Sequence, residues 1–264
     1  MQARQGAAIK KRPAFREMKR NQAIALVTVC LILGFAAVIH AQFGFFRGMI
    51  RQNDPPPTEL VIARWKFGTN GRIGNMGWSH NYPDAEMHLN QLLLEATGVN
   101  VKPESFRIVE LGSPEVFKYP FAYVSEPGEM ELSEKELVNL RQFIDRGGFI
   151  VVDDFDGSWQ MDQFRRQMFR AFPDRSLIPL TRDHEIFHTF FDIEDLEIWG
   201  PYVPGSNPIF YGFPNQHGDL AMIICFNNDF ANFWDWIDQR RYPLKPSSEA
   251  FRMGINFVMY ATTH

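Results

Sequence analysis

Buried strands and amphipathic helices alternate along most of this chain. Apolar residues follow one another without a break in Phe149–Val152 and Leu220–Phe226, as they do in strands that are covered on both faces. Between such runs, apolar positions recur three or four residues apart in Ala85–Thr97 and Glu134–Arg146, which predicts helices. The alternation predicts an α/β domain over residues 60–264, with a mostly parallel central sheet and right-handed crossovers.

Start and stop residues support these predictions. Ser133 and Glu136 have the spacing of a capping box, and Gly147 supplies the left-handed residue that ends the same helix. The same patterns predict further strands at 60–66, 106–111 and 121–125, and further helices at 160–172 and 251–260.

A separate apolar segment precedes the domain. Residues 21–46 contain no Asp, Glu, Lys or Arg, and the apolar core at 23–39 is just long enough to cross a bilayer. One interpretation is an uncleaved N-terminal hydrophobic helix that anchors the chain in the membrane. The other is a signal peptide that begins at Met18 and is cleaved near Ala41. Both place the domain in the cell envelope, as a periplasmic or extracellular domain.

Charge is distributed unevenly between the ends of the chain. Residues 1–20 are strongly basic, whereas the rest of the chain carries 30 acidic against 20 basic residues. An acidic domain is a poor nucleic-acid binder, because phosphate contacts need Lys and Arg. We therefore expect no nucleic-acid partner. The expected partners are the membrane, through an uncleaved helix, and an envelope protein or small polar ligand beyond the Pro-rich linker 47–59.

Two aspartates mark the end of the central strand. Asp153 and Asp154 follow Phe149–Val152, where open α/β folds place their ligands. Carboxylates there can bind a cation or act as acid and base. The alternative is that one caps the following segment and the other pairs with an Arg. Neighbouring strand residues point to opposite faces, so both share a pocket only if the strand has already ended.

Two other segments carry candidate ligand-binding residues. Asn228 and Asp229 follow the strand at 220–226, and Trp234 lies in the aromatic run behind them. This pattern is typical of a sugar pocket, although an aromatic core covering the sheet is the alternative. The loop at 68–84 lacks the glycine spacing of a phosphate-binding loop. It contributes three further candidates, Trp78, His80 and Asp84.

A histidine pair matches the zinc-protease motif H-E-x-x-H. His184 and His188 flank Glu185 in this pattern, but the chemistry needs both on one helical face and a third ligand. The preceding residues, LIPLTRD, show no helical pattern, so we favour a structural or substrate contact. We predict no metal and no cofactor. Nucleophiles are scarce: no Ser lies in G-x-S-x-G, and Cys225 is interpreted as a buried structural thiol.

Several motifs, in order, resemble one bacterial family. ARWKFG (63–68), NYPDAEMHLNQLL (81–93), FIDRGGFIVVDDF (143–155) and FRMGINFVMYATTH (251–264) look like the family called domain of unknown function 4159. The resemblance implies a fold similar to class I glutamine amidotransferases, a flavodoxin-like three-layer sandwich, in exported or membrane-anchored proteins. It implies no established activity or catalytic residue. Relatives commonly read D-H-P-I-F-H where this chain reads D-H-E-I-F-H at 183–188. Glu185, which the zinc-protease motif needs, therefore departs from the family pattern, and the match to that motif looks accidental.

The wider amidotransferase-like fold places a nucleophilic Cys after the strand that follows the Gly-Gly turn. This chain has Asp153 or Asp154 there, and a glutaminase needs a thiolate. We therefore expect a non-catalytic binding or interaction module. The alternative is a carboxylate- or metal-dependent hydrolase, for example on a glycan, with its site at the strand ends. A third interpretation, a structural envelope partner, predicts an exposed apolar patch and no pocket.

Overall fold

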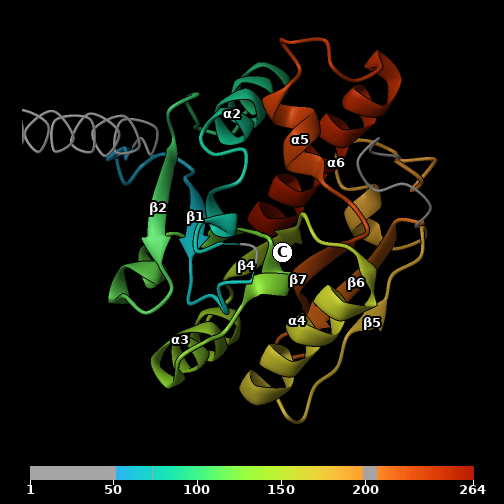
Figure 1. Cartoon of the computed structure of the whole chain (residues 1–264). Helices are drawn as coiled ribbons and strands as arrows, with labels where there is room; N and C mark the ends of the chain where they lie inside the picture. The colour runs from blue at the N-terminus through green and yellow to red at the C-terminus, as the bar shows by residue number, and fades with distance from the viewer. Residues whose placement is uncertain (1–51, 73, 199–206) are drawn as a thin grey trace, which may run out of the picture. The chain divides into compact units, whose positions relative to one another are not determined.

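A seven-stranded sheet forms the centre of the computed structural model, which describes residues 52–72, 74–198 and 207–264. The strand order is β2-β1-β3-β4-β7-β6-β5 (Figure 1). The first five strands of this order are parallel to one another. β6 is antiparallel to its neighbour β7, and β5 is antiparallel to β6. The predicted α/β class with a mostly parallel sheet is therefore confirmed. The strands are β1 (Ile62–Lys66), β2 (Phe106–Glu110), β3 (Phe121–Ser125), β4 (Phe149–Asp153), β5 (Ile178–Pro179), β6 (Ile209–Pro214) and β7 (Leu220–Phe226).

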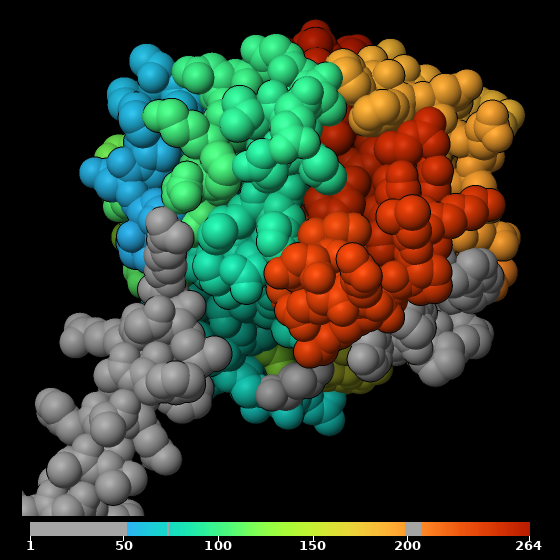
Figure 2. All heavy atoms as spheres, turned by 90° about the horizontal axis from the view of Figure 1, so that it is seen from above, coloured from blue at the N-terminus to red at the C-terminus, as the bar shows by residue number. Residues whose placement is uncertain are grey.

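Helices lie on both sides of the sheet. α2 (Asp84–Ala96), α5 (Phe230–Asp235) and α6 (Leu244–Thr263) pack together on one face, and Figure 2 shows α2 beside the α5 segment there. α3 (Glu134–Asp145) and α4 (Gly157–Ala171) pack together on the other. The continuous apolar run of β4 is therefore buried on both faces. The described residues also form four short 3₁₀ helices, η1 (Gly77–Ser79), η2 (Pro114–Lys118), η3 (Pro127–Glu129) and η4 (Glu185–Phe187).

The helix ends follow the sequence signals closely. Ser133 and Glu136 form the predicted capping box, and Gly147 has a φ of 88° just past the end of α3. Three helices begin earlier than predicted, α2 at Asp84 by one residue, α4 at Gly157 and α6 at Leu244. α6 extends over Pro246 because proline is tolerated in the first turn of a helix, where no N–H is needed.

Two strands and one α-helix were not predicted, namely β5, β6 and α5. β6 contains Gly212, and a Cβ atom there would lie 2.6 Å from Cδ1 of the Leu220 side chain. α5 buries Phe230, Phe233 and Trp234 against the sheet. Phe230, Phe233 and Trp234 therefore match the alternative of an aromatic core that covers the sheet, and the buried Trp234 does not line an open pocket.

The main hydrophobic core lies between the sheet and the α2, α5 and α6 layer. Strand residues such as Tyr123, Val151 and Ile223 contribute to it, as do Trp234 of α5 and Phe257 of α6. Cys225 of β7 is fully buried in this core, and burial raises its thiol pKa well above the usual range. The prediction of a buried structural thiol is confirmed.

The predicted N-terminal segments, 1–20 and 21–46, lie outside the described residues, as does the start of linker 47–59. Among the described helices, none is long and apolar enough to cross a bilayer. The described end of the linker lies along β2, where Gln52 exchanges side-chain hydrogen bonds of 3.0 and 2.9 Å with the backbone of Ile108. These last linker residues therefore contact the domain directly.

Candidate functional site

An open cleft of about 340 Å³ lies at the carboxyl ends of β3, β4 and β7. The order of strand addition switches sides at β1, since β2 lies on one side of β1 and the later strands lie on the other. Open α/β sheets bind their ligands beside such a switch point. The cleft is lined by His80, Glu126, Asp154, Phe155, Asp156, Gln160, Asn228, Asp229, Asn232 and Trp236.

The backbone bends sharply where three parallel strands end. Glu126, Asp154 and Asn227 are the first residues after β3, β4 and β7, and their φ angles are 53°, 64° and 56°. Left-handed backbone in residues other than glycine costs of order 1–3 kcal/mol each and gathers at functional sites. Its repetition around one cleft supports the assignment of this edge as the candidate site.

His80 and Asp154 meet in the cleft. Nδ1 of His80 lies 2.6 Å from Oδ2 of Asp154, which also accepts a hydrogen bond of 2.8 Å from the Ser125 hydroxyl. The bond to Asp154 raises the pKa of His80, against an opposing effect of partial burial. His80, Glu126 and Asp154 each offer one ligand atom, and these atoms lie within 4.8 Å of one another. This set of donors is suited to a metal ion, which the sequence did not predict.

Carboxyl groups dominate the lining of the cleft. Four of its lining residues are carboxylates (Glu126, Asp154, Asp156 and Asp229), and none is Lys or Arg. Burial and the neighbouring Asp154 raise the pKa of Glu126 to about 8. Burial, followed by the charges of Asp154 and Asp153, raises the pKa of Asp229 well above its usual range. Asp229 also caps α5, since its Oδ1 accepts a 3.0 Å hydrogen bond from the backbone N–H of Asn232.

Asp153 does not reach the cleft, although the sequence grouped it with Asp154. Its Oδ2 accepts hydrogen bonds from the Tyr123 hydroxyl at 2.5 Å and from the backbone N–H groups of Phe230 and Ala231 at 2.7 and 3.2 Å. Burial raises its pKa to about 7. Strand alternation separates the two aspartates, so Asp153 anchors the start of α5 while Asp154 faces the cleft.

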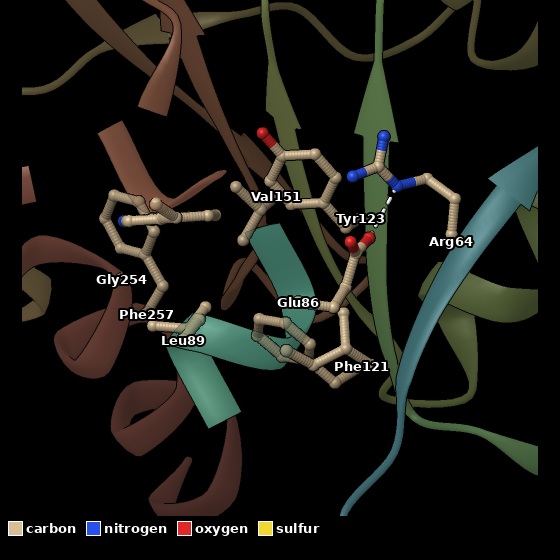
Figure 3. Close-up of a pocket in the computed structure, with 10 residues that line it drawn as sticks. Arg64, Glu86, Leu89, Phe121, Tyr123, Val151, Gly254 and Phe257 are labelled. Atoms are coloured by element: carbon tan, nitrogen blue, oxygen red, sulfur yellow. Dashed lines mark hydrogen bonds and ion pairs between the residues drawn. The ribbon is translucent and has the colours of Figure 1, made fainter. Parts of the chain in front are cut away.

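A buried ion pair positions the loop that carries His80. Nε of Arg64 donates to Glu86 at 2.7 Å, as Figure 3 shows, and both side chains are buried. Nη1 of Arg64 also donates to the backbone carbonyls of Trp78 and His80, at 3.1 and 2.7 Å. The adjoining cavity measures only about 10 Å³, room for about one water molecule. Arg64 therefore acts through the loop rather than on a ligand.

Three other predicted residues lie away from the cleft. Trp234 is 2% exposed and donates through Nε1 to the carbonyl of Ala250. Trp78 is buried and donates to the carbonyl of Asn75, whereas Asp84 is exposed at the first turn of α2. Among the three loop candidates, only His80 lines the site.

The histidine pair lies at the opposite edge of the sheet. His184 and Tyr260 are ring neighbours, and Tyr260 packs on Phe149 at the start of β4. His184 accepts from the backbone N–H of Ile186, and His188 pairs with Asp192. The motif forms a 3₁₀ turn, not a helix, so it lacks the zinc-protease geometry. The structural interpretation agrees with these contacts.

Six lining residues were missed, namely Glu126, Phe155, Asp156, Gln160, Asn232 and Trp236. A usable signal existed for Glu126, because it directly follows the predicted strand at 121–125, as Asp153 and Asp154 follow theirs. Asn232 and Trp236 lie in or beside α5, which the pattern did not reveal.

Comparison with known proteins supports the family resemblance. The sequence matches the family described as Domain of unknown function (DUF4159) over residues 62–262. A comparison with proteins of curated function found no match. The match covers all seven strands and both helix layers. The chain therefore belongs to the DUF4159 family.

Proposed function

We propose that this domain binds a small polar ligand in the strand-end cleft and acts as a binding or interaction module. The observation that carries the proposal is the convergence of carboxylate, amide and imidazole side chains on one open cleft of about 340 Å³. Concave sites with a few placed polar groups are how proteins orient small ligands. None of the lining residues is Ser, Cys, Thr or Lys, so a hydroxyl, thiol or amine nucleophile does not line the cleft.

The lining indicates the chemical class of the ligand. The lining is rich in carboxyl groups and contains no Lys or Arg, so the cleft offers no fixed positive charge to bind a phosphate or a carboxylate. Trp236, which is partly exposed, adds aromatic surface beside these groups, and aromatic rings pack well against the apolar face of a molecule whose edge is polar. The favoured ligand is therefore neutral and hydroxylated, such as a sugar, or cationic.

A ligand panel on the full chain tests this proposal. Thermal unfolding is followed with neutral sugars, amino sugars, inorganic phosphate and citrate, each with and without a divalent cation. We expect a neutral or amino sugar to raise Tm and the anions to have no effect. Trp236→Ala should weaken the shift, whereas Trp159→Ala, which removes a tryptophan outside the lining, should retain it. Stabilisation by phosphate alone would contradict the proposal.

We further propose the flavodoxin-like, amidotransferase-like sandwich and a location in the cell envelope. The five parallel strands run in the order β2-β1-β3-β4-β7, which supports the first because flavodoxin-like sheets follow the order 2-1-3-4-5. The uncharged segment at 21–46 supports the second. N-terminal sequencing of the exported protein separates the two forms: a start at Gln42 indicates cleavage, and an intact N-terminus indicates an anchor.

A carboxylate-dependent hydrolase is the second candidate function. Asp154 lies on the turn between β4 and α4 with a φ of 64°, and Nδ1 of His80 is 2.6 Å from its carboxylate. Some hydrolases place their nucleophile on such a strained strand-to-helix turn, and carboxylates serve as nucleophiles in glycosidases. Turnover of chromogenic glycosides and esters by the full chain, lost in Asp154→Asn, would favour this candidate. Equal rates in both proteins would exclude it.

A further inference from the structure

We propose that the cleft holds one divalent transition-metal ion, such as Zn²⁺ or Mn²⁺, bound by His80, Glu126 and Asp154. The inference rests on the proposed function, because it places the ion in the same cleft and makes it part of how the polar ligand is held. It goes further by naming the side chains that bind the ion, and by assigning the open coordination position to an oxygen atom of water or of the polar ligand.

Three separate chain segments supply the donor atoms. His80 comes from the loop after β1, Glu126 is the first residue after β3, and Asp154 is the first residue after β4. Their ligand atoms lie within 4.8 Å of one another. The Asp154 side chain is 10% exposed and that of His80 is 46% exposed, so the donors are held by the fold and remain accessible from solvent.

A buried amide provides an independent observation at the same place. Asn228 lines the cleft and is 2% exposed, yet its Nδ2 has no hydrogen-bond partner within the described residues. Its Oδ1 already accepts from the backbone N–H of Asp229 at 3.0 Å. A buried donor without an acceptor is unfavourable. An oxygen atom on the ion, from water or from the ligand, would supply that acceptor.

The donor types select the class of ion. Ca²⁺ and Mg²⁺ prefer sites made only of oxygen, whereas imidazole suits Zn²⁺ and similar transition ions. Three protein ligands also leave at least one coordination position open for a water or ligand oxygen. Because no Lys or Arg lines the cleft, no fixed positive charge there competes with the ion.

Calorimetric titration of the full chain tests the inference. The protein is treated with EDTA, dialysed, and titrated with Zn²⁺ and separately with Mn²⁺. We expect one ion per chain, and affinity reduced by about tenfold or more in Asp154→Asn and His80→Ala. Asp192→Asn is the matched control, because Asp192 also pairs with a histidine, His188, but lies outside the cleft. Its affinity should equal that of the wild type.

Circular dichroism verifies that each variant is folded. If Asp154→Asn does not fold, His80→Ala carries the test, since nearly half of that side chain is exposed. The inference is overturned if neither ion binds saturably, or if His80→Ala binds as tightly as Asp192→Asn. If no ion binds but a neutral ligand still stabilises the wild type, the metal site is contradicted and the proposed function is not. If neither ions nor ligands bind, the proposed function is contradicted as well.

Discussion

Adjacent residues at the end of β4 have different roles. Asp154 faces the cleft, whereas Asp153 is buried and holds the start of α5. The sequence located both aspartates because open α/β sheets bind ligands at the carboxyl ends of their strands. The alternation of side chains along a strand indicated that the two carboxyl groups would point to opposite faces of the sheet. The sequence did not reveal what Asp153 binds, because its partners, Tyr123 and the N–H groups of α5, are distant along the chain or lie in an element that was not predicted.

The buried ion pair of Arg64 and Glu86 offers a test of what one residue contributes. Arg64→Met leaves Glu86 buried and unpaired, so we expect a loss of about 3–5 kcal/mol in the free energy of unfolding. Arg64→Met combined with Glu86→Met should recover much of this loss. Both proteins lose the hydrogen bonds to the carbonyls of Trp78 and His80. Amide exchange at residues 78–81 should therefore be faster in both, and unchanged exchange would contradict the positioning role of Arg64.

The pKa of Glu126 predicts a pH dependence of stability. Its folded-state value, about 8, lies above the ordinary value of 4.5, so folding favours the protonated form. Its contribution is fully present below pH 4.5 and is lost as the pH rises through 8. Glu126→Gln is always neutral, so its free energy of unfolding should rise relative to wild type across this window. Urea denaturation with chelator measures the trend, and Glu104→Gln, at an exposed position, is the matched control for the loss of one carboxyl group.

Elements with a continuous apolar run or a helical period were predictable, whereas elements without such a pattern were not. The continuous apolar runs of β3, β4 and β7 and the capped helix α3 were located within one residue of their observed ends. β6 was missed because Gly212 and Pro214 are unfavourable in strands. α5 has six residues, of which three are large aromatics. Such a segment is too short to show helical periodicity, and tertiary burial stabilises it instead.

The packing of α6 against α2 and α5 can be tested at Gly254. A Cβ atom there would lie 2.7 Å from the Trp234 ring and 2.9 Å from Leu89. Gly254→Ala should therefore cost about 1–3 kcal/mol through overpacking, although alanine favours helix. Gly98→Ala is the matched control, since nothing lies within 4 Å of its Cβ position. Chemical denaturation measures both, and equal stabilities would contradict the close packing of α6 on α2 and α5.

The order of the strands makes the site, and this order is a property of the whole molecule. The loop after β1 and the ends of β3, β4 and β7 meet because these strands are neighbours in a parallel sheet. The sequence predicted each strand end, but not which ends would meet. Hence His80 could be proposed as a candidate but not paired with Asp154, which lies 74 residues further along the chain.

Paramagnetic broadening by Mn²⁺ tests the central claim, that the strand-end cleft is the binding site, most directly. Amide signals of the full chain, in a mild detergent, are followed as Mn²⁺ is added below one equivalent. We predict selective broadening around His80, Glu126 and Asp154, relieved by excess EDTA. The acidic groove lined by Glu194, Asp195, Glu197 and Glu249 provides the comparison within the same molecule. Broadening confined to that groove, or spread evenly over the surface, would contradict the account.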